Sequence, residues 1–314
     1  MIRTADMISK IFPDDPLLSE ILYALIASSH KIFTHVKNDD GMTSMNVSNS
    51  SGDTQIKLDI IADKIFRSHL KEVKNVKYIV SEEQADLIDL GGDLYSIVLD
   101  PLDGSKSAKV GIPCGSIFGV FKNISRNSDF CGKNIIASGF FVYGARHELF
   151  IAAAGKVSRY REQDEPNIWT EGTIGSRILD TRMLSINAAN YEYWPPWMQR
   201  FYLEQFSTAN SNKKPFNMRW YASLVSDVKR LLLEGGLFAY PGDIRAGYEH
   251  GQLRLVYEAI PMAFLVSTFG GSASSGETDI LTANVTDIHQ KTPLFLGSQD
   301  HVESVKQFSS SMKP

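Results

Sequence analysis

Two aspartates stand three residues apart at the end of an apolar run, Ile97-Val98-Leu99-Asp100-Pro101-Leu102-Asp103-Gly104-Ser105. Two hard oxygen donors on one loop suit Mg²⁺ or Mn²⁺, which bind carboxylates together with phosphate oxygens. Backbone N–H groups around Gly104 and Ser105 would suit a phosphate, especially at the start of a helix. The same residue types also make an ordinary capped β-turn, with Pro101 ending the strand. Local spacing alone leaves both interpretations open.

Further carboxylates lie at the ends of neighbouring predicted elements. Glu82 and Glu83 follow a strand predicted over 76–80, and the next strand, over 95–99, leads into Asp100. If these strands are parallel neighbours, both ends meet at one edge of the sheet, where the active sites of α/β proteins lie. Asp53 and Asp59 begin a helix predicted over 53–70. Standing alone, Asp53 would be a helix N-cap and Asp59 a solvated charge.

The elements that must position these carboxylates are a mixture of helices and strands. Apolar residues at helical spacing predict a helix over 16–33, and the polar segment 37–52 predicts a loop. Segment 116–160 predicts an antiparallel meander of strands. The second half predicts helices over 194–206, 218–233, 261–269 and 302–308, with strands over 237–240 and 292–296. The fold class is therefore mixed α/β, with units expected at 1–184 and 185–314.

Composition excludes several classes of protein. A 314-residue chain with 43% hydrophobic and 22% charged residues is ordinary for a globular enzyme. The net charge of −4 offers no basic surface for nucleic acid, and no apolar run of membrane-spanning length is present. Two cysteines, Cys114 and Cys131, make no disulfide framework, so buried thiols and a reducing compartment are expected. With no signal core, a cytoplasmic location follows, and a plastid or other organelle stays open.

Five segments considered together carry a family resemblance. They are Gly52-Asp53 with Leu58-Asp59, Ser81-Glu82-Glu83, Asp100 to Ser105, Leu253-Arg254-Leu255-Val256-Tyr257-Glu258, and Pro293-Leu294-Phe295-Leu296-Gly297-Ser298. In this order and spacing they resemble the family of fructose-1,6-bisphosphatases and sedoheptulose-1,7-bisphosphatases, from about residue 53 to residue 308. The resemblance implies a layered α-β-α-β-α sugar phosphatase fold with two sheets, and hydrolysis of the 1-phosphate of a sugar bisphosphate.

The resemblance also implies a role for each acidic residue. The metal ligands would be the carboxylates of Glu82, Asp100, Asp103 and Glu258 and the carbonyl of Leu102, with Asp53 as an outer-site acid. They would hold two or three Mg²⁺ ions, with Mn²⁺ as an alternative. Asp59 and Glu83 would activate the attacking water as a pair that shares one proton. Asp103, Gly104 and Ser105 would bind the 1-phosphate.

The sugar and the far phosphate would be bound by residues of the second half. The family positions correspond to Asn187, Arg219, Tyr240, Gln252 and Arg254. An arginine suits phosphate because its planar fork donates paired hydrogen bonds, although either arginine alone would be taken as part of a surface ion pair. Arg219 matches an arginine that the family supplies across a subunit interface, which implies a homo-oligomer, either a dimer or a tetramer.

Departures from the family pattern bear on the substrate. Gln252 stands where fructose bisphosphatases usually have lysine, Asn190 where a tyrosine is expected, and Trp220 where a phosphate-binding tyrosine is common. The family's AMP-binding segment is not recognised either. These changes favour sedoheptulose 1,7-bisphosphate, with fructose 1,6-bisphosphate or dual specificity as the alternative. An inositol or nucleotide phosphatase is a third interpretation. The complete carboxylate set argues against a non-catalytic metabolite sensor on the same fold.

Overall fold

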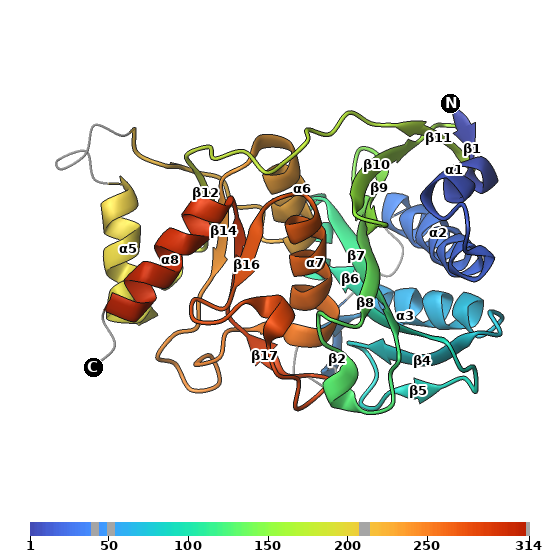
Figure 1. Cartoon of the computed structure of the whole chain (residues 1–314), viewed down its shortest axis with the longest axis horizontal. Helices are drawn as coiled ribbons and strands as arrows, with labels where there is room; N and C mark the ends of the chain where they lie inside the picture. The colour runs from blue at the N-terminus through green and yellow to red at the C-terminus, as the bar shows by residue number, and fades with distance from the viewer. Residues whose placement is uncertain (39–43, 49–53, 207–213, 312–314) are drawn as a thin grey trace.

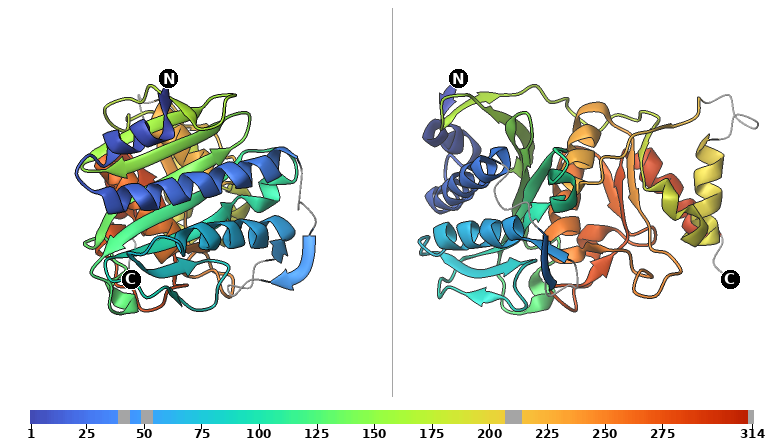
Figure 2. Two further views of the ribbon diagram at one scale, coloured as in Figure 1. Left: turned by 90° about the vertical axis from the view of Figure 1, so that its right-hand side faces the viewer. Right: turned by 180° about the vertical axis from the view of Figure 1, so that it is seen from behind.

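The computed structural model describes residues 1–38, 44–48, 54–206 and 214–311. Two main sheets alternate with three layers of helices (Figure 1). Figure 2 shows that the N-terminal helices lie side by side across one face of the larger sheet. The outer helices on that face are α1 (Thr4–Ile11), α2 (Pro16–Lys37) and α3 (Lys57–Leu70), the middle layer holds α6 (Leu224–Glu234) and α7 (Ile260–Thr268), and the other outer layer holds α5 (Pro196–Phe206) and α8 (Gln299–Ser311). This arrangement confirms the predicted α-β-α-β-α layering.

The larger sheet has nine strands in the order β1-β11-β10-β9-β8-β7-β6-β4-β5. Consecutive strands β6 to β10 pair antiparallel, which confirms the predicted meander. β4 and β6 are the parallel pair of this sheet, with Ser81 opposite Leu99. The strands are β1 (Ile2–Arg3), β4 (Val76–Ser81), β5 (Ile88–Asp89), β6 (Tyr95–Asp103), β7 (Cys114–Lys122), β8 (Ile135–Tyr143), β9 (His147–Ala153), β10 (Lys156–Glu162) and β11 (Ile168–Glu171).

The smaller sheet has five strands in the order β13-β12-β14-β18-β16. Two further pairs stand apart from it, β15 with β17 and β2 with β3. The strands are β2 (Ser44–Ser48), β3 (Thr54–Ile56), β12 (Met183–Ser185), β13 (Asn217–Met218), β14 (Leu237–Tyr240), β15 (Leu253–Arg254), β16 (Ser272–Ser274), β17 (Lys291–Thr292) and β18 (Leu294–Gly297). A short α4 (Ser105–Ala108) follows β6.

The middle layer joins the two sheets through one apolar core. Val98 and Phe140 of the larger sheet pack in the same cluster as Val225 of α6, Ile260 of α7 and Leu296 of the smaller sheet. Each such side chain contributes about 1.5–3 kcal/mol when it is removed from water. This shared core fixes α6 and α7 against β6 and β7. The division of the chain at 184/185 stays a prediction.

The first half of the chain departs from the predicted elements in two places. The helix predicted from Asp53 begins at Lys57, because the N-cap is Ile56, whose N–H donates to the Asp59 carboxylate at 2.6 Å. The cap assigned to Asp53 was therefore wrong, and Asp53 itself lies outside the described residues. Part of the predicted loop 37–52 forms β2. The rest of that loop, at 39–43 and 49–52, lies outside the described residues as well.

Pro101 does not end its strand as predicted. β6 continues to Asp103, and its register against β7 shifts between Asp100 and Asp103. A proline is tolerated at such an irregularity because the ladder does not require its missing N–H there. In the second half, the helix predicted from residue 218 begins only at Leu224, after the short strand β13.

The two cysteines are both unbonded, as the sequence predicts. Cys114 is buried, and burial raises the pKa of its thiol to about 12, so the thiol stays protonated at neutral pH. Cys131 is only partly buried, so the prediction of two buried thiols was wrong for that residue.

Candidate active site

The parallel pairing of β4 with β6 brings two acidic segments to one edge of the larger sheet. Ser81, the last residue of β4, lies opposite Leu99, and the N–H of Glu82 donates to the Leu99 carbonyl at 3.1 Å. Glu82 therefore lies beside Asp100, which follows Leu99. This geometry confirms the predicted meeting of the two strand ends.

Glu258 joins these residues from the other half of the chain. One carboxylate oxygen of each of Asp100, Asp103 and Glu258 lies within 4.8 Å of the others. Glu258 lies in a π-helical turn, Leu255–Ala259, that runs directly into α7, and its Oε2 accepts the N–H of Arg254 at 2.5 Å. A π turn has i→i+5 backbone hydrogen bonds, is wider than an α-helical turn, and is frequent at functional sites. The three carboxylates fit a divalent cation that prefers oxygen ligands.

The electrostatics of Asp100 also fit a cation. Asp100 is 2% exposed. Burial raises its pKa well above the ordinary value, and the negative charges of Glu82, Asp103, Glu258 and Glu83 raise it further, in that order. A buried cluster of carboxylates without a compensating charge is costly, and a divalent cation removes that cost.

Asp103 is held by the start of α6. Its Oδ2 accepts a hydrogen bond from Ser223 Oγ at 2.8 Å and another from the Val225 N–H at 2.9 Å. Burial raises the pKa of Asp103, and these two donors oppose that rise because they stabilise the charged carboxylate. Sequence reasoning missed Ser223, because the helix predicted over 218–233 placed it inside a helix rather than before the first residue of α6.

The backbone directly after Asp103 lies very close to Ser223, the residue before α6. Gly104 has a φ of +78°, and a Cβ at this position would lie 2.7 Å from the Ser223 Cβ. Leu102 donates its N–H to Asp100 Oδ1 at 3.0 Å, which fixes the peptide directly before the one whose carbonyl is the expected metal ligand. Ser105 begins α4, which is only four residues long. The phosphate-binding role of Asp103, Gly104 and Ser105 stays a prediction.

Asp59, the expected member of the water-activating pair, is 4% exposed. Burial raises its pKa to about 6, against the opposing effects of the Ile56 N–H, the Ser105 side chain and the Lys109 charge. The Ser105 contact brings α3 to the Asp100–Ser105 loop. Glu83, the proposed second member, is close enough for its charge to raise the pKa of Asp100.

The residues expected to bind the sugar and the far phosphate fall into two groups. Arg254 and Tyr240 lie near Glu258, since Arg254 donates to its carboxylate and the Glu258 charge is among the causes, after burial and Tyr248, that raise the pKa of Tyr240. Arg219 is exposed and donates to the adjacent Met218 carbonyl at 2.9 Å, and Asn187 caps the turn Ala188–Tyr193. For these last two, no contact with the carboxylates is found among the described residues.

A second group of possible metal ligands lies elsewhere in the described part of the chain. It consists of His30 on α2, His147 on β9 and Glu162 on β10. Glu162 accepts from His147 Nδ1 at 2.6 Å and from His30 Nδ1 at 3.1 Å. These hydrogen bonds account for the cluster as a link between α2 and the larger sheet.

Comparison with known proteins agrees with this geometry. The family model described as "Fructose-1-6-bisphosphatase, N-terminal domain" matches residues 9–165, and the one described as "Fructose-1-6-bisphosphatase, C-terminal domain" matches residues 179–310. A "Fructose-1,6-bisphosphatase class 1 2" of Cereibacter sphaeroides is 38% identical over 265 residues, covering 83% of this chain and 80% of the relative. A "Fructose-1,6-bisphosphatase class 1" of Paracoccus denitrificans is 31% identical over 299 residues, covering 93% and 90%.

Solved structures give the same result for the fold. Leishmania major fructose-1,6-bisphosphatase in its holo form superposes with a TM-score of 0.90 at 28% identity, covering 98% of this chain and 99% of that one. The same enzyme in the T-state gives a TM-score of 0.85, with 98% of each chain covered. Among the described residues, no helix has the length and apolar character needed to cross a membrane.

Proposed function

This chain belongs to the fructose-1,6-bisphosphatase family, and we propose that it removes the 1-phosphate of fructose 1,6-bisphosphate with the help of Mg²⁺. The observation that carries the proposal is the group of Asp100, Asp103 and Glu258, of which Asp100 and Glu258 are buried, with the backbone N–H of Arg254 bonded to Glu258. The relatives named as fructose-1,6-bisphosphatases support this substrate. The sedoheptulose preference that the sequence suggested finds no support among those relatives.

In this proposal, the acidic residues divide the chemistry between them. Glu82, Asp100, Asp103, Glu258 and the Leu102 carbonyl would hold the cations, with Asp53 at an outer position. A bound divalent cation supplies charge neutralisation at the phosphate and on the leaving alkoxide. Phosphate monoesters are very inert without such assistance.

In this proposal, a pair of carboxylates accepts the proton of the attacking water. Asp59, with a pKa of about 6, is deprotonated in most molecules at neutral pH and can accept a proton from the attacking water. Glu83 shares that role. The backbone at Gly104 and Ser105 orients the phosphate, and Asn187, Arg219, Tyr240 and Arg254 bind the rest of the substrate.

A second candidate substrate is sedoheptulose 1,7-bisphosphate. Trp220 is 40% exposed on the same segment as Arg219, where the family commonly has a phosphate-binding tyrosine. A bulkier side chain there, together with Gln252 and Asn190, changes the space offered to the far end of the sugar. We propose further that the protein is a cytoplasmic homo-oligomer that does not respond to AMP.

The test compares phosphate release from the two bisphosphates over a range of Mg²⁺ concentrations, with and without AMP. We expect a higher kcat/KM for fructose 1,6-bisphosphate, no effect of AMP, and loss of turnover with a chelator. Asp103→Ala should abolish the activity. If turnover persists in that variant, the metal assignment is wrong, and if the seven-carbon substrate is clearly preferred, the second candidate replaces the first.

A further inference from the structure

The strand β6 contains an extra residue directly after Asp100. Between Asp100 and Asp103 the register of β6 against β7 shifts, so that Pro101 and Leu102 share one position opposite β7, that of Ser116. Such a β-bulge is common beside active sites, where it turns a side chain to a new direction. Asp100 belongs to the group of three carboxylates that fits a cation. The structure around the bulge therefore bears on the direction of the Asp100 carboxylate.

The hydroxyl of Ser116 bonds to the bulge from the neighbouring strand. Ser116 is completely buried, and its Oγ donates to the Pro101 carbonyl at 2.7 Å. The N–H of the same peptide unit, which belongs to Leu102, donates to Asp100 Oδ1 at 3.0 Å. This one peptide is therefore held at both of its polar atoms, by Ser116 at the carbonyl and by the Asp100 carboxylate at the N–H.

Tyr143 continues this chain of hydrogen bonds into β8. Its hydroxyl lies 2.7 Å from Ser116 Oγ. A serine has a single O–H donor, and the Pro101 carbonyl, which can only accept, receives it. Tyr143 is therefore the donor to Ser116, and the chain runs in one direction, from Tyr143 through Ser116 to Pro101. In such a chain each hydrogen bond polarises and strengthens the next.

The ring of Tyr143 is itself firmly held. It is 1% exposed, and its centroid lies 6.2 Å from that of Phe33 on α2 and 5.6 Å from that of His147 on β9. Burial raises the pKa of the Tyr143 hydroxyl well above its ordinary value, and the negative charge of Asp100 adds to this rise as a smaller cause. The hydroxyl therefore keeps its proton at neutral pH and stays a donor.

We propose that Ser116 and Tyr143 are positioning residues for the proposed cation site, because they hold the peptide that fixes the Asp100 carboxylate. The inference rests on the proposed function, since it assumes a divalent cation at Asp100. The Leu102 carbonyl, the other ligand expected from this loop, belongs to the next peptide, so a shift of the Pro101–Leu102 peptide would move both ligands. Hydrogen bonds that orient the ligands of a metal commonly change its affinity by about 10- to 100-fold.

The experiment measures the binding of Mn²⁺ to the protein without substrate, from the electron paramagnetic resonance signal of the free ion. For Ser116→Ala we expect the dissociation constant to rise about tenfold. Ser138→Ala is the matched control, because Ser138 is also completely buried, on β8, and its hydroxyl donates to the Pro261 carbonyl at 2.7 Å. This control should leave the dissociation constant unchanged.

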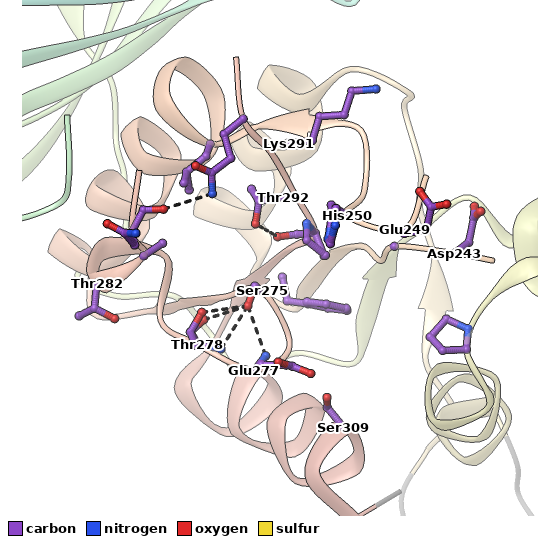
Figure 3. A pocket seen from close by; sticks show the side chains of 18 of the residues that line it. Asp243, Glu249, His250, Ser275, Glu277, Thr278, Thr282, Lys291, Thr292 and Ser309 are labelled. Atoms are coloured by element: carbon purple, nitrogen blue, oxygen red, sulfur yellow. Dashed lines mark hydrogen bonds between the residues drawn. The ribbon is translucent and has the colours of Figure 1, made fainter. Parts of the chain in front are cut away.

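A second control lies in the pocket shown in Figure 3. Ser275 has the same kinds of partner as Ser116, one carbonyl and one hydroxyl, and both belong to Thr278 in its own loop. Ser275→Ala removes this pattern of hydrogen bonds from another part of the chain. The affinity for Mn²⁺ should stay at its wild-type value in this variant.

A double variant separates positioning from stability. Ser116→Ala leaves the Tyr143 hydroxyl buried without its partner, which lowers stability, and Ser116→Ala/Tyr143→Phe removes that hydroxyl as well. We expect the double variant to regain part of the lost melting temperature, while its dissociation constant for Mn²⁺ stays as high as in Ser116→Ala. Tyr143→Phe alone should raise the constant by a smaller factor, because Ser116 still donates to Pro101. If the affinity recovers together with the melting temperature, the role of Ser116 is structural only.

The outcomes also separate this inference from the function on which it rests. If Ser116→Ala weakens the binding of Mn²⁺ no more than Ser138→Ala does, the positioning role is wrong, while wild-type release of phosphate from fructose 1,6-bisphosphate still supports the proposed function. If the wild-type protein neither binds Mn²⁺ nor hydrolyses a sugar bisphosphate, the proposed function fails and the inference fails with it.

Discussion

The Asp103 carboxylate accepts a hydrogen bond from Ser223, a residue 120 positions later in the chain, at 2.8 Å. One oxygen of this carboxylate thereby holds the start of α6, and the residue also belongs to the group with Asp100 and Glu258. The position of a middle-layer helix and the geometry of the proposed cation site are linked through a single side chain.

Ser223→Ala tests this link. Removing the hydroxyl leaves Asp103 with one fewer donor to stabilise its charged form, so its pKa rises and protons compete better with Mg²⁺. We expect the Mg²⁺ concentration for half-maximal activity to rise several-fold, and the free energy of unfolding to fall by about 1 kcal/mol. Ser226→Ala is the matched control, since it loses a bond to the Pro113 carbonyl from the same helix. A metal requirement that shifts equally in both variants would contradict the link.

The pKa of Asp59 predicts the acid limb of the pH profile. The base form is needed, so kcat/KM should rise with pH through about 6 and level off above it. The charge of Lys109 lowers this pKa, so Lys109→Met should move the limb to higher pH, while Lys106→Met on the same segment should leave it in place. Initial rates measured from pH 5 to pH 9 decide the matter. A limb that moves to lower pH in Lys109→Met has the wrong sign for this assignment.

Alanine in place of Gly104 should clash with a neighbouring residue, whereas alanine in place of Gly111 should not. Both have positive φ, +78° and +74°, but only at Gly104 would a Cβ meet another atom, the Ser223 Cβ at 2.7 Å. Gly111→Ala should cost only the backbone strain of about 1 kcal/mol. Gly104→Ala should cost more and should also displace the start of α6 from Asp103, lowering activity. Thermal melting and activity of the two variants provide the comparison, and equal losses in both would argue against the contact.

If Arg219 reaches a neighbouring subunit, an Arg219→Ala subunit and an Asp59→Asn subunit should complement each other. Arg219→Ala should raise KM for the bisphosphate, and Asp59→Asn should lose activity altogether. If Arg219 serves a neighbouring subunit, mixed oligomers regain activity, because an Arg219→Ala site receives the arginine of an Asp59→Asn partner. Refolding the two variants together and measuring turnover tests this. Activity in the mixture equal to the sum of the separate variants would show that Arg219 acts within its own subunit.

The sequence allowed most of the carboxylate group to be predicted, because its members lie in short motifs at the ends of predictable strands. Asp100 and Glu82 follow apolar runs whose parallel pairing is a common arrangement. The continuation of β6 through Pro101 was not predictable, since it depends on pairing with β7 across a register shift. Local sequence carries no information on such tertiary pairing.

Contacts between polar residues that are far apart in the sequence could not be predicted either, because they too depend on the tertiary fold. Nothing near Ser223 indicates that its hydroxyl bonds to Asp103, and nothing near Gln252 indicates that Lys291 lies beside it. Both contacts arise only after the chain has folded.

The contacts of Asp103 with Ser223 and Glu258 also have a consequence during translation of the chain. The N-terminal half emerges from the ribosome first. It already contains Asp100 and Asp103, while Ser223 and Glu258 have still to be synthesised. The proposed cation site therefore lacks one of its three carboxylates on a chain that stops before Glu258. In the proposed function, binding of the cation would thus report that the chain has been translated through Glu258 and has folded.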